Sequence, residues 1–244
     1  MVKKDGKLLR YEVQRVLFTK PYLFLSLVTV VYSIYVLQAK TLFGEYGTAP
    51  FSQWSYLVYL LTLMPVLCTT VLVYIAKTTD SSERLVQNIT RSTPTPAGQQ
   101  LMVKFLAIAI SFLVNLLIVV AAAYIFYEIK LKLFAPLNLL LCTLIIAAPQ
   151  FLICAGAGFW AARVRPGAVY VLAALLFFLS AVQIALPMGL DFFGNSILSI
   201  AENTAPVQGV IAFSVPTAYA VSRIAVTCIG AALIVTACSK KQRA

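Results

Sequence analysis

Six apolar runs, each long enough to cross a lipid bilayer, constrain this chain more than any other feature. They cover residues 21–39, 55–76, 104–127, 136–162, 167–187 and 220–238. A transmembrane helix needs about 20 apolar residues, and in lipid the backbone polar groups of a segment must be paired internally. The runs therefore predict an all-α integral membrane protein, with six transmembrane helices in a single domain over 1–244. Pro149 within the fourth run predicts a tilt or kink there.

The composition agrees with a membrane location. The chain is 61% hydrophobic and 11% charged, whereas soluble domains average about 25% charged residues. A net charge of +11 would suggest a nucleic-acid partner in a soluble protein. Here the basic residues are better explained as topology signals and contacts to lipid headgroups. We therefore expect the lipid bilayer, and no nucleic acid, as a partner.

The basic residues are unevenly divided between the two sides that the runs define. With a cytoplasmic N-terminus, all but four of the 19 Lys and Arg residues are cytoplasmic; the four are Lys40, Lys130, Lys132 and Arg223. This asymmetry predicts a multi-pass protein of the plasma membrane with both termini in the cytoplasm. Aromatic residues near the outer ends of the runs predict an interfacial belt: Tyr32, Tyr35, Trp54, Tyr56, Tyr59, Tyr124 and Tyr127.

Two segments outside the runs have patterns of their own. Residues 7–20, KLLRYEVQRVLFTK, place apolar side chains at helical spacing among charged ones, which predicts an amphipathic elbow helix in the inner headgroup layer. The alternative is an early turn of the first span, although Pro21 favours a break. Residues 188–219 lack Lys and Arg, contain Pro206 and Pro216, and are too short in their apolar parts to span. They predict outer re-entrant helices.

The side chains that most enzymes use are missing. The chain has no histidine, and its five cysteines lie in apolar runs without metal-ligand spacing. No GxxxxGK[ST] loop occurs, and all eight acidic residues fall outside the middle of the spans. We therefore expect no catalytic residue, no metal site and no cofactor on this chain, and a bundle whose spans carry no fixed charge. Ion-driven transport usually needs such a charge.

A few polar residues do lie within the spans. Asn115, Gln150 and Gln183 are candidates for the lining of a transport path. The alternative is that they form hydrogen bonds to neighbouring helices, each contributing about 0.6–2 kcal/mol.

The longest cytoplasmic connection, residues 77–103, is polar. Asp80 and Ser81 are good N-cap candidates for about two helical turns, and STPTPAG at 92–98 then ends the helix. A short capped helix held between two spans can act as a lever. The alternative is an ordinary cytoplasmic loop.

Three stretches together resemble the type-2 membrane permeases of ATP-binding-cassette (ABC) exporters. They are RYEVQRVLFTKPYLF at 10–24, ERLVQNITRSTPTPAGQQLMVKFLA at 83–107 and SVPTAY at 214–219. The first is similar to that family's elbow helix, the second to its coupling region and the third to a turn before its last span. The chain departs from the family where Leu85 and Val86 replace a Gly-Thr pair and Asn88 replaces an acidic residue.

The resemblance implies a passive, non-enzymatic subunit of a bacterial transporter. Two separate ABC ATPase subunits would dock below it and carry the ATP and Mg. A second copy or a homologous permease would complete the transport unit, with the path along a seam formed by the second and fifth spans. The side chains expected to contact the ATPase are Glu83, Arg84, Leu85, Val86 and Ile89.

The expected activity is outward movement of a hydrophobic or amphipathic compound, such as a peptide, an antibiotic or a lipid. A lantibiotic or bacteriocin immunity permease of the same fold is an alternative. A substrate-capture component of an uptake system is an alternative from another class, but it would need neither the elbow helix nor the coupling region. An integral-membrane enzyme is a third, but it would need an intramembrane acid, base or metal site.

Overall fold

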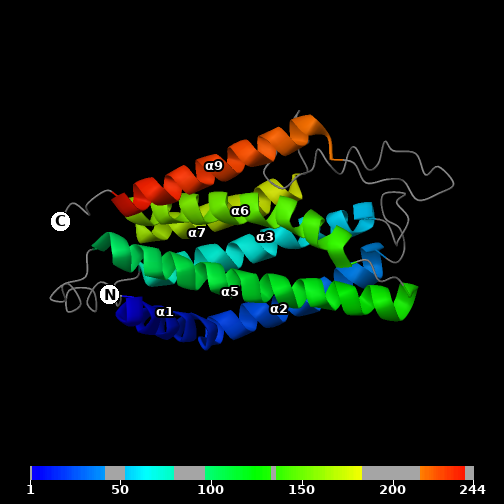
Figure 1. The fold of residues 1–244 in the computed structure, drawn as a ribbon, viewed down its shortest axis with the longest axis horizontal. Helices are drawn as coiled ribbons and strands as arrows, with labels where there is room; N and C mark the ends of the chain where they lie inside the picture. Colours follow the sequence, from blue (N-terminus) through cyan, green and yellow to red (C-terminus); the bar gives the residue numbers. More distant parts are fainter. Residues whose placement is uncertain (1, 42–52, 80–96, 133–135, 183–214, 240–244) are drawn as a thin grey trace.

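The computed structural model describes residues 2–41, 53–79, 97–132, 136–182 and 215–239, and within these ranges all regular structure is helical. Figure 1 shows long helices lying side by side in one bundle. The helices are α1 (Val2–Leu17), α2 (Lys20–Val36) continued by a π-helical turn (Leu37–Thr41), α3 (Gln53–Thr78), α5 (Ala97–Phe126) continued by a second π-helical turn (Tyr127–Leu131), α6 (Pro136–Val164), α7 (Pro166–Ala181) and α9 (Thr217–Ser239).

Within the described residues, five helices are long and apolar enough to cross a membrane. They comprise Lys20–Ala39, Gln53–Thr78, Gly98–Lys130, Leu139–Val164 and Thr217–Cys238. The span expected at 167–187 corresponds to α7, whose 16 residues extend about 24 Å, less than the roughly 30 Å hydrocarbon core. The rest of that run, including Gln183, lies outside the described residues. The described part of the chain thus contains five membrane-length helices and one shorter apolar helix.

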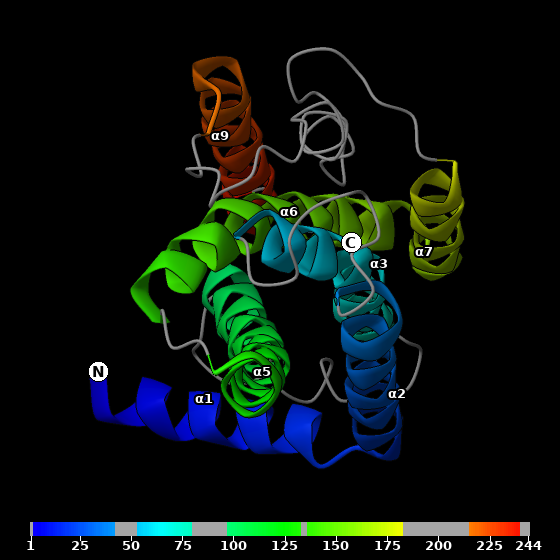
Figure 2. The same cartoon turned by 90° about the vertical axis from the view of Figure 1, so that its right-hand side faces the viewer.

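A break at Phe18 and Thr19 separates α1 from α2. Thr19 is extended (φ −79°, ψ 141°), and Pro21 falls in the first turn of α2, where proline is tolerated because no intrahelical N–H is needed. The Thr19 hydroxyl donates to the Val16 carbonyl over 2.9 Å. The separate helix expected over 7–20 therefore corresponds to α1, which begins and ends earlier. Figure 2, a view along the bundle, shows α1 running crosswise along one edge of the bundle, beside α5.

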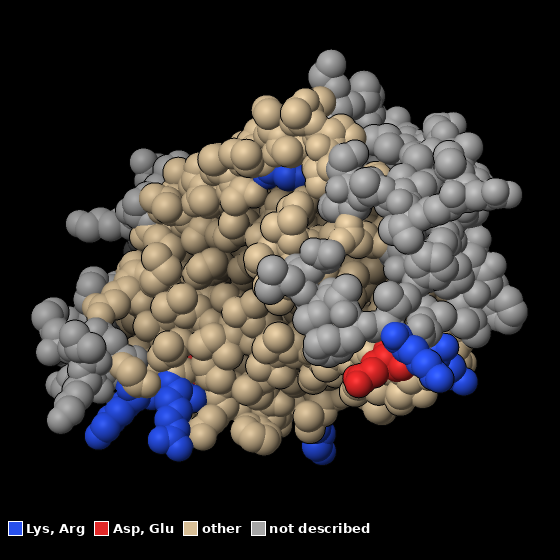
Figure 3. Space-filling model, turned by 45° about the vertical axis from the view of Figure 1, so that its right-hand side comes forward, with Lys and Arg blue, Asp and Glu red and all other residues tan. Residues whose placement is uncertain are grey.

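The central helix is α3. Most of its side chains are buried, including Leu60, Leu67 and Ile75, and it contacts α2, α5, α6 and α7. On the other side of α6 lies α9 (Figures 1 and 2). On the outside of the bundle, α2 exposes Leu27, α9 exposes Ile224 and α7 exposes Phe178. Figure 3 shows a face that is largely free of charge, with charged side chains in small groups.

Two glycines let α6 and α9 approach closely. A Cβ atom at Gly230 would lie 2.7 Å from the backbone nitrogen of Ile153 and 2.7 Å from the carbonyl carbon of Leu152. A Cβ atom at Gly156 would lie 2.9 Å from the carbonyl oxygen of Gly230. Small residues are common at such crossings in membranes because association there depends on close van der Waals contact.

The expected aromatic belt is wrong for the second span and for Tyr127 at the end of the third. Trp54, Tyr56, Tyr59 and Tyr127 are buried inside the bundle. Only Tyr35, at 60% exposure, is strongly exposed among the belt candidates. The error arises because the position of a residue in an apolar run indicates its depth in the membrane. It does not indicate whether the side chain faces lipid or a neighbouring helix.

Candidate functional site

A polar junction is formed where α1 crosses the end of α3 and the beginning of α5. We call it the α1–α3–α5 junction and define it by Glu12, Arg15, Tyr74, Thr78 and Lys104. The helices lie so that α3 ends and α5 begins at the same end of the bundle as α1 (Figure 1). This is therefore the place where the helices flanking the segment 80–96 are held.

Hydroxyl groups close the end of α3. The Thr78 hydroxyl donates to the Ile75 carbonyl over 2.8 Å, and the Thr79 hydroxyl lies 2.9 Å from the Ala76 carbonyl and 3.0 Å from that of Ile75. The last carbonyls of a helix have no intrahelical partner. Local side-chain donors thus complete this helix end without a glycine.

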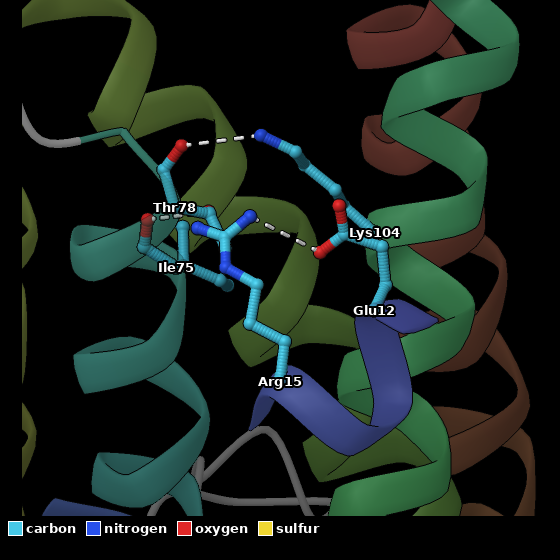
Figure 4. Close-up of polar contacts among 5 residues, drawn as sticks. All are labelled: Glu12, Arg15, Ile75, Thr78 and Lys104. Carbon is cyan, nitrogen blue, oxygen red and sulfur yellow. Dashed lines mark hydrogen bonds and ion pairs between the residues drawn. The ribbon is translucent and has the colours of Figure 1, made fainter. Parts of the chain in front are cut away.

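Lys104 of α5 connects the two helices. Its Nζ donates to the carbonyl oxygen of Thr78 over 3.5 Å (Figure 4). A cation near a helix C-terminus also interacts favourably with the negative end of the helix dipole. Lys104 therefore links the beginning of α5 to the end of α3 through both contact and charge.

Helix α1 contributes an ion pair. Arg15 Nη1 lies 3.6 Å from Glu12 Oε2, and the side chains are 34% and 13% exposed. Pairs at this spacing contribute about 0.2–0.5 kcal/mol, so this pair orients side chains more than it stabilises the fold. Lys104 interacts electrostatically with both members. Figure 4 shows Glu12 beside Lys104 and the Arg15 guanidinium directed toward the end of α3.

A small cavity lies between α1 and the end of α3. Its volume is about 40 Å³, and it is lined by Glu12, Arg15, Val16, Thr19, Tyr74, Lys77 and Thr78. A cavity needs a volume of about 10–15 Å³ to hold one water molecule. This cavity could therefore hold roughly three. Tyr74 also packs on Tyr22 of α2, with ring centroids 5.6 Å apart.

The side chains expected to contact an ATPase lie outside the described residues. These are Glu83, Arg84, Leu85, Val86 and Ile89, all within 80–96. Helices occupy both ends of the expected coupling region 77–103, since α3 extends to Thr78 and α5 begins at Ala97. Most of the expected re-entrant segment 188–219 is also outside the described residues, and α9 begins at Thr217.

Asn115 forms hydrogen bonds between α5 and α2. Its Oδ1 accepts from Ser26 Oγ over 2.8 Å and from the Tyr22 hydroxyl over 3.2 Å. The Tyr22 hydroxyl is also 3.2 Å from the Ser111 carbonyl. Of the two alternatives for this residue, the interhelical bond is present, and a role in a path stays a prediction. Gln150 is buried in α6 at 1% exposure, and its role in a path also stays a prediction.

A second polar group in the core was not anticipated from the sequence. The Tyr59 hydroxyl donates to the Val119 carbonyl over 3.0 Å and lies 2.6 Å from Ser33 Oγ. The Tyr56 hydroxyl lies 2.7 Å from Thr143 Oγ1. These bonds tie α3 to α2, α5 and α6, and tyrosines at spacing i, i+3 within an apolar run are the signal that could have indicated them.

Arg223 is a buried charged residue near the beginning of a membrane-length helix. It lies in the second turn of α9, within Thr217–Cys238, and is 3% exposed; its assignment to the outer side stays a prediction. Its guanidinium carbon is 4.6 Å from the centre of the Tyr219 ring, within the range of a cation–π interaction. An ionisable residue buried in a membrane-length helix is a candidate functional residue. The sequence signal was a single arginine after SVPTAY.

Comparison with known proteins yields no relative. No protein-family model, no curated protein and no solved structure matches this chain. The residues and their geometry are thus the basis for assigning a function.

Proposed function

We propose that this chain is the membrane-spanning permease subunit of an ATP-driven exporter, moved by a separate ATPase that contacts residues 80–96. The proposal places the end of the bundle with α1 in the cytoplasm of a bacterial cell. ATP and Mg would bind the partner ATPase. The side chains of this chain would then bind the partner and transmit its movement.

The observation that carries the proposal is the construction of the α1–α3–α5 junction. The two helices that flank 80–96 are linked directly, through Lys104 and the Thr78 carbonyl. Both are also held by α1, which packs along α5 and places Arg15 beside the end of α3. A force applied to 80–96 would therefore act on a connected set of three helices.

The burial of α3 supports transmission of such a force into the bundle. Because protein interiors are close-packed and resist compression, an axial or rotational shift of a helix buried on most sides displaces its neighbours. Those neighbours are α2, α5, α6 and α7. Movement at the junction would thus reach the helices around α3.

The residues within the spans favour a hydrophobic or amphipathic cargo. The described spans carry few charges, so a small hydrophilic ion has few partners. Arg223, buried in α9, offers one fixed positive charge. It favours an amphipathic cargo with an acidic group over a wholly neutral one.

Burial also limits where a second permease copy can pack. A seam through the second and fifth spans was expected from the resemblance, yet most of α3 is buried within one chain. The fifth apolar segment, α7, exposes Tyr170, Val171, Leu175 and Phe178. We therefore propose that α7 forms the seam between the two permease copies and that α3 takes no part in it.

Co-purification of the ATPase tests the proposal. The full chain would be co-expressed with a candidate ATPase that contains a phosphate-binding loop and is encoded beside it. The double variant Glu83→Lys/Arg84→Glu should lose the ATPase during purification and lose ATP-dependent transport in proteoliposomes. A matched control, Glu128→Lys/Lys130→Glu, also leaves net charge unchanged but alters exposed residues beyond the opposite end of α5.

The outcomes separate the alternatives. Retention of the ATPase and of coupled transport in Glu83→Lys/Arg84→Glu would refute the assigned contact. Tight binding of a small molecule by the purified chain, with no ATPase retained by the unmodified protein, would favour a substrate-capture component. Turnover of a lipid or peptide by the chain alone would favour an enzyme.

A further inference from the structure

The cavity beside α1 is surrounded by an excess of positive charge. Arg15 and Lys77 line it, and Glu12 is the acidic residue among its lining side chains. Lys104 lies close enough to interact with both Glu12 and Arg15. These four described residues sum to two positive charges, which favours a bound anion.

The exposed face of α1 places this cavity at the depth of lipid headgroups. Leu8, Tyr11 and Phe18 are 36%, 62% and 76% exposed. With Arg15 they recur at spacings of three and four residues, so they form one stripe along the helix. An amphipathic helix with an exposed apolar stripe and basic residues lies at the boundary of headgroups and acyl chains. Arg15 therefore extends from the stripe into the cavity at phosphate depth.

The chemistry of the lining suits a phosphate group. A guanidinium offers paired N–H donors that match two phosphate oxygens, and an ammonium adds a mobile positive charge. Arg15 supplies the first from α1, and Lys77 supplies the second from α3. Thr19 and Tyr74 line the same cavity. A volume of about 40 Å³ admits the oxygens of one such group.

We infer that this cavity binds the phosphate of an anionic phospholipid, which bridges Arg15 of α1 and Lys77 of α3. Zwitterionic lipids also carry a phosphate, but the cations around the cavity would repel their positive headgroup. The bound lipid would fasten the elbow helix to the end of the central helix. This inference is independent of the proposed exporter function, because it concerns only binding to the chain itself.

Native mass spectrometry of the full chain in detergent tests the inference. Phosphatidylglycerol, phosphatidylcholine and inorganic phosphate are titrated separately, and phosphate is also tested as a competitor. The unmodified chain should retain one tightly bound phosphatidylglycerol and bind phosphatidylcholine more weakly. In Arg15→Gln/Lys77→Gln, affinity for phosphatidylglycerol should fall roughly thirtyfold, because each cation contributes about 1 kcal/mol, or roughly fivefold.

A matched variant on the same helix provides the control. Lys7→Gln/Arg10→Gln removes the same charge from exposed positions of α1 outside the cavity. Its affinity should stay within about threefold of the unmodified chain, because exposed charges are screened by salt. An equal loss in both double variants would show general attraction and overturn the inference.

A further variant is expected to change the lipid affinity in the opposite direction. Glu12→Gln removes the acidic group from the lining, so phosphatidylglycerol should bind more tightly, by about fivefold. Unchanged or weaker binding in Glu12→Gln would overturn the inference even if the double variant fails to fold. Displacement of the lipid by millimolar inorganic phosphate would overturn the assignment to a lipid and indicate a site for free phosphate.

Discussion

The contact between α6 and α9 gives a sharp prediction about stability, because backbone rather than side chains fills the space at Gly230. A methyl group there would lie 2.7 Å from Ile153 N and Leu152 C. Ordinary van der Waals contact begins at 3.4 Å, so α9 would have to move by about 0.7 Å. Backbone atoms in a helix cannot rotate away as a side chain can.

We expect Gly230→Ala to destabilise the protein by about 1–3 kcal/mol, the usual cost of overpacking a well-packed site. Gly167 in α7 supplies the matched control, since no described atom lies within 4 Å of the position that a methyl group would take there. Gly167→Ala should be neutral or should stabilise by about 0.4–1 kcal/mol, because alanine favours the helix and restricts the unfolded chain.

The measurement is reversible unfolding in mixed micelles, followed by circular dichroism as the denaturing detergent is increased. A second arm tests the contact itself. Gly156 faces Gly230 across the same crossing, so one displacement of α9 can relieve both methyl groups. The double variant Gly156→Ala/Gly230→Ala should therefore cost less than the sum of the single variants. Equal effects of Gly230→Ala and Gly167→Ala, or strict additivity of the pair, would refute the reasoning.

Three further predictions concern polar contacts. Asn115→Leu should lower stability by about 0.6–2 kcal/mol, since it removes the acceptor shared by two α2 hydroxyls; an unfolding titration that shows no loss would contradict this. Tyr59→Phe should cost a similar amount because its hydroxyl is bonded on two sides, whereas Tyr35→Phe, at a 60% exposed position, should be neutral in the same titration. Arg223→Met should reduce proteoliposome transport of an acidic amphiphile about tenfold or more relative to a neutral one, because it removes the buried positive charge. Equal loss of transport for both cargoes would show that Arg223 acts on folding or on movement alone.

The sequence was a good guide to the position of helices along the chain. The apolar runs at 55–76 and 220–238 correspond to α3 and α9, because a bilayer imposes a minimum length on apolar segments. The break near Pro21 also follows from local chemistry. At 167–187 the described helix is only 16 residues long, so the six-span arrangement remains an expectation.

The candidate site was only partly accessible to sequence analysis. The polar stretch 77–103 indicated where a partner could bind, but the residues assigned to that contact lie outside the described ranges. The α1–α3–α5 junction joins Glu12 to Lys104, which are far apart in the chain, and no local pattern connects them. The assignment of Arg223 to the outer side stays a prediction, and its burial in α9 could not be inferred from a count of charges.

By itself the sequence determined that this chain is helical and apolar enough for a membrane, since hydropathy and helix length depend only on neighbouring residues. Only the tertiary structure decided which side of each helix faces another helix. It buried Tyr56 and Tyr59 instead of exposing them to lipid, brought Gly156 against Gly230, and formed the cavity between α1 and α3. The physical reason is that lipid and protein interior are both apolar, so hydropathy cannot distinguish a side chain that faces one from a side chain that faces the other.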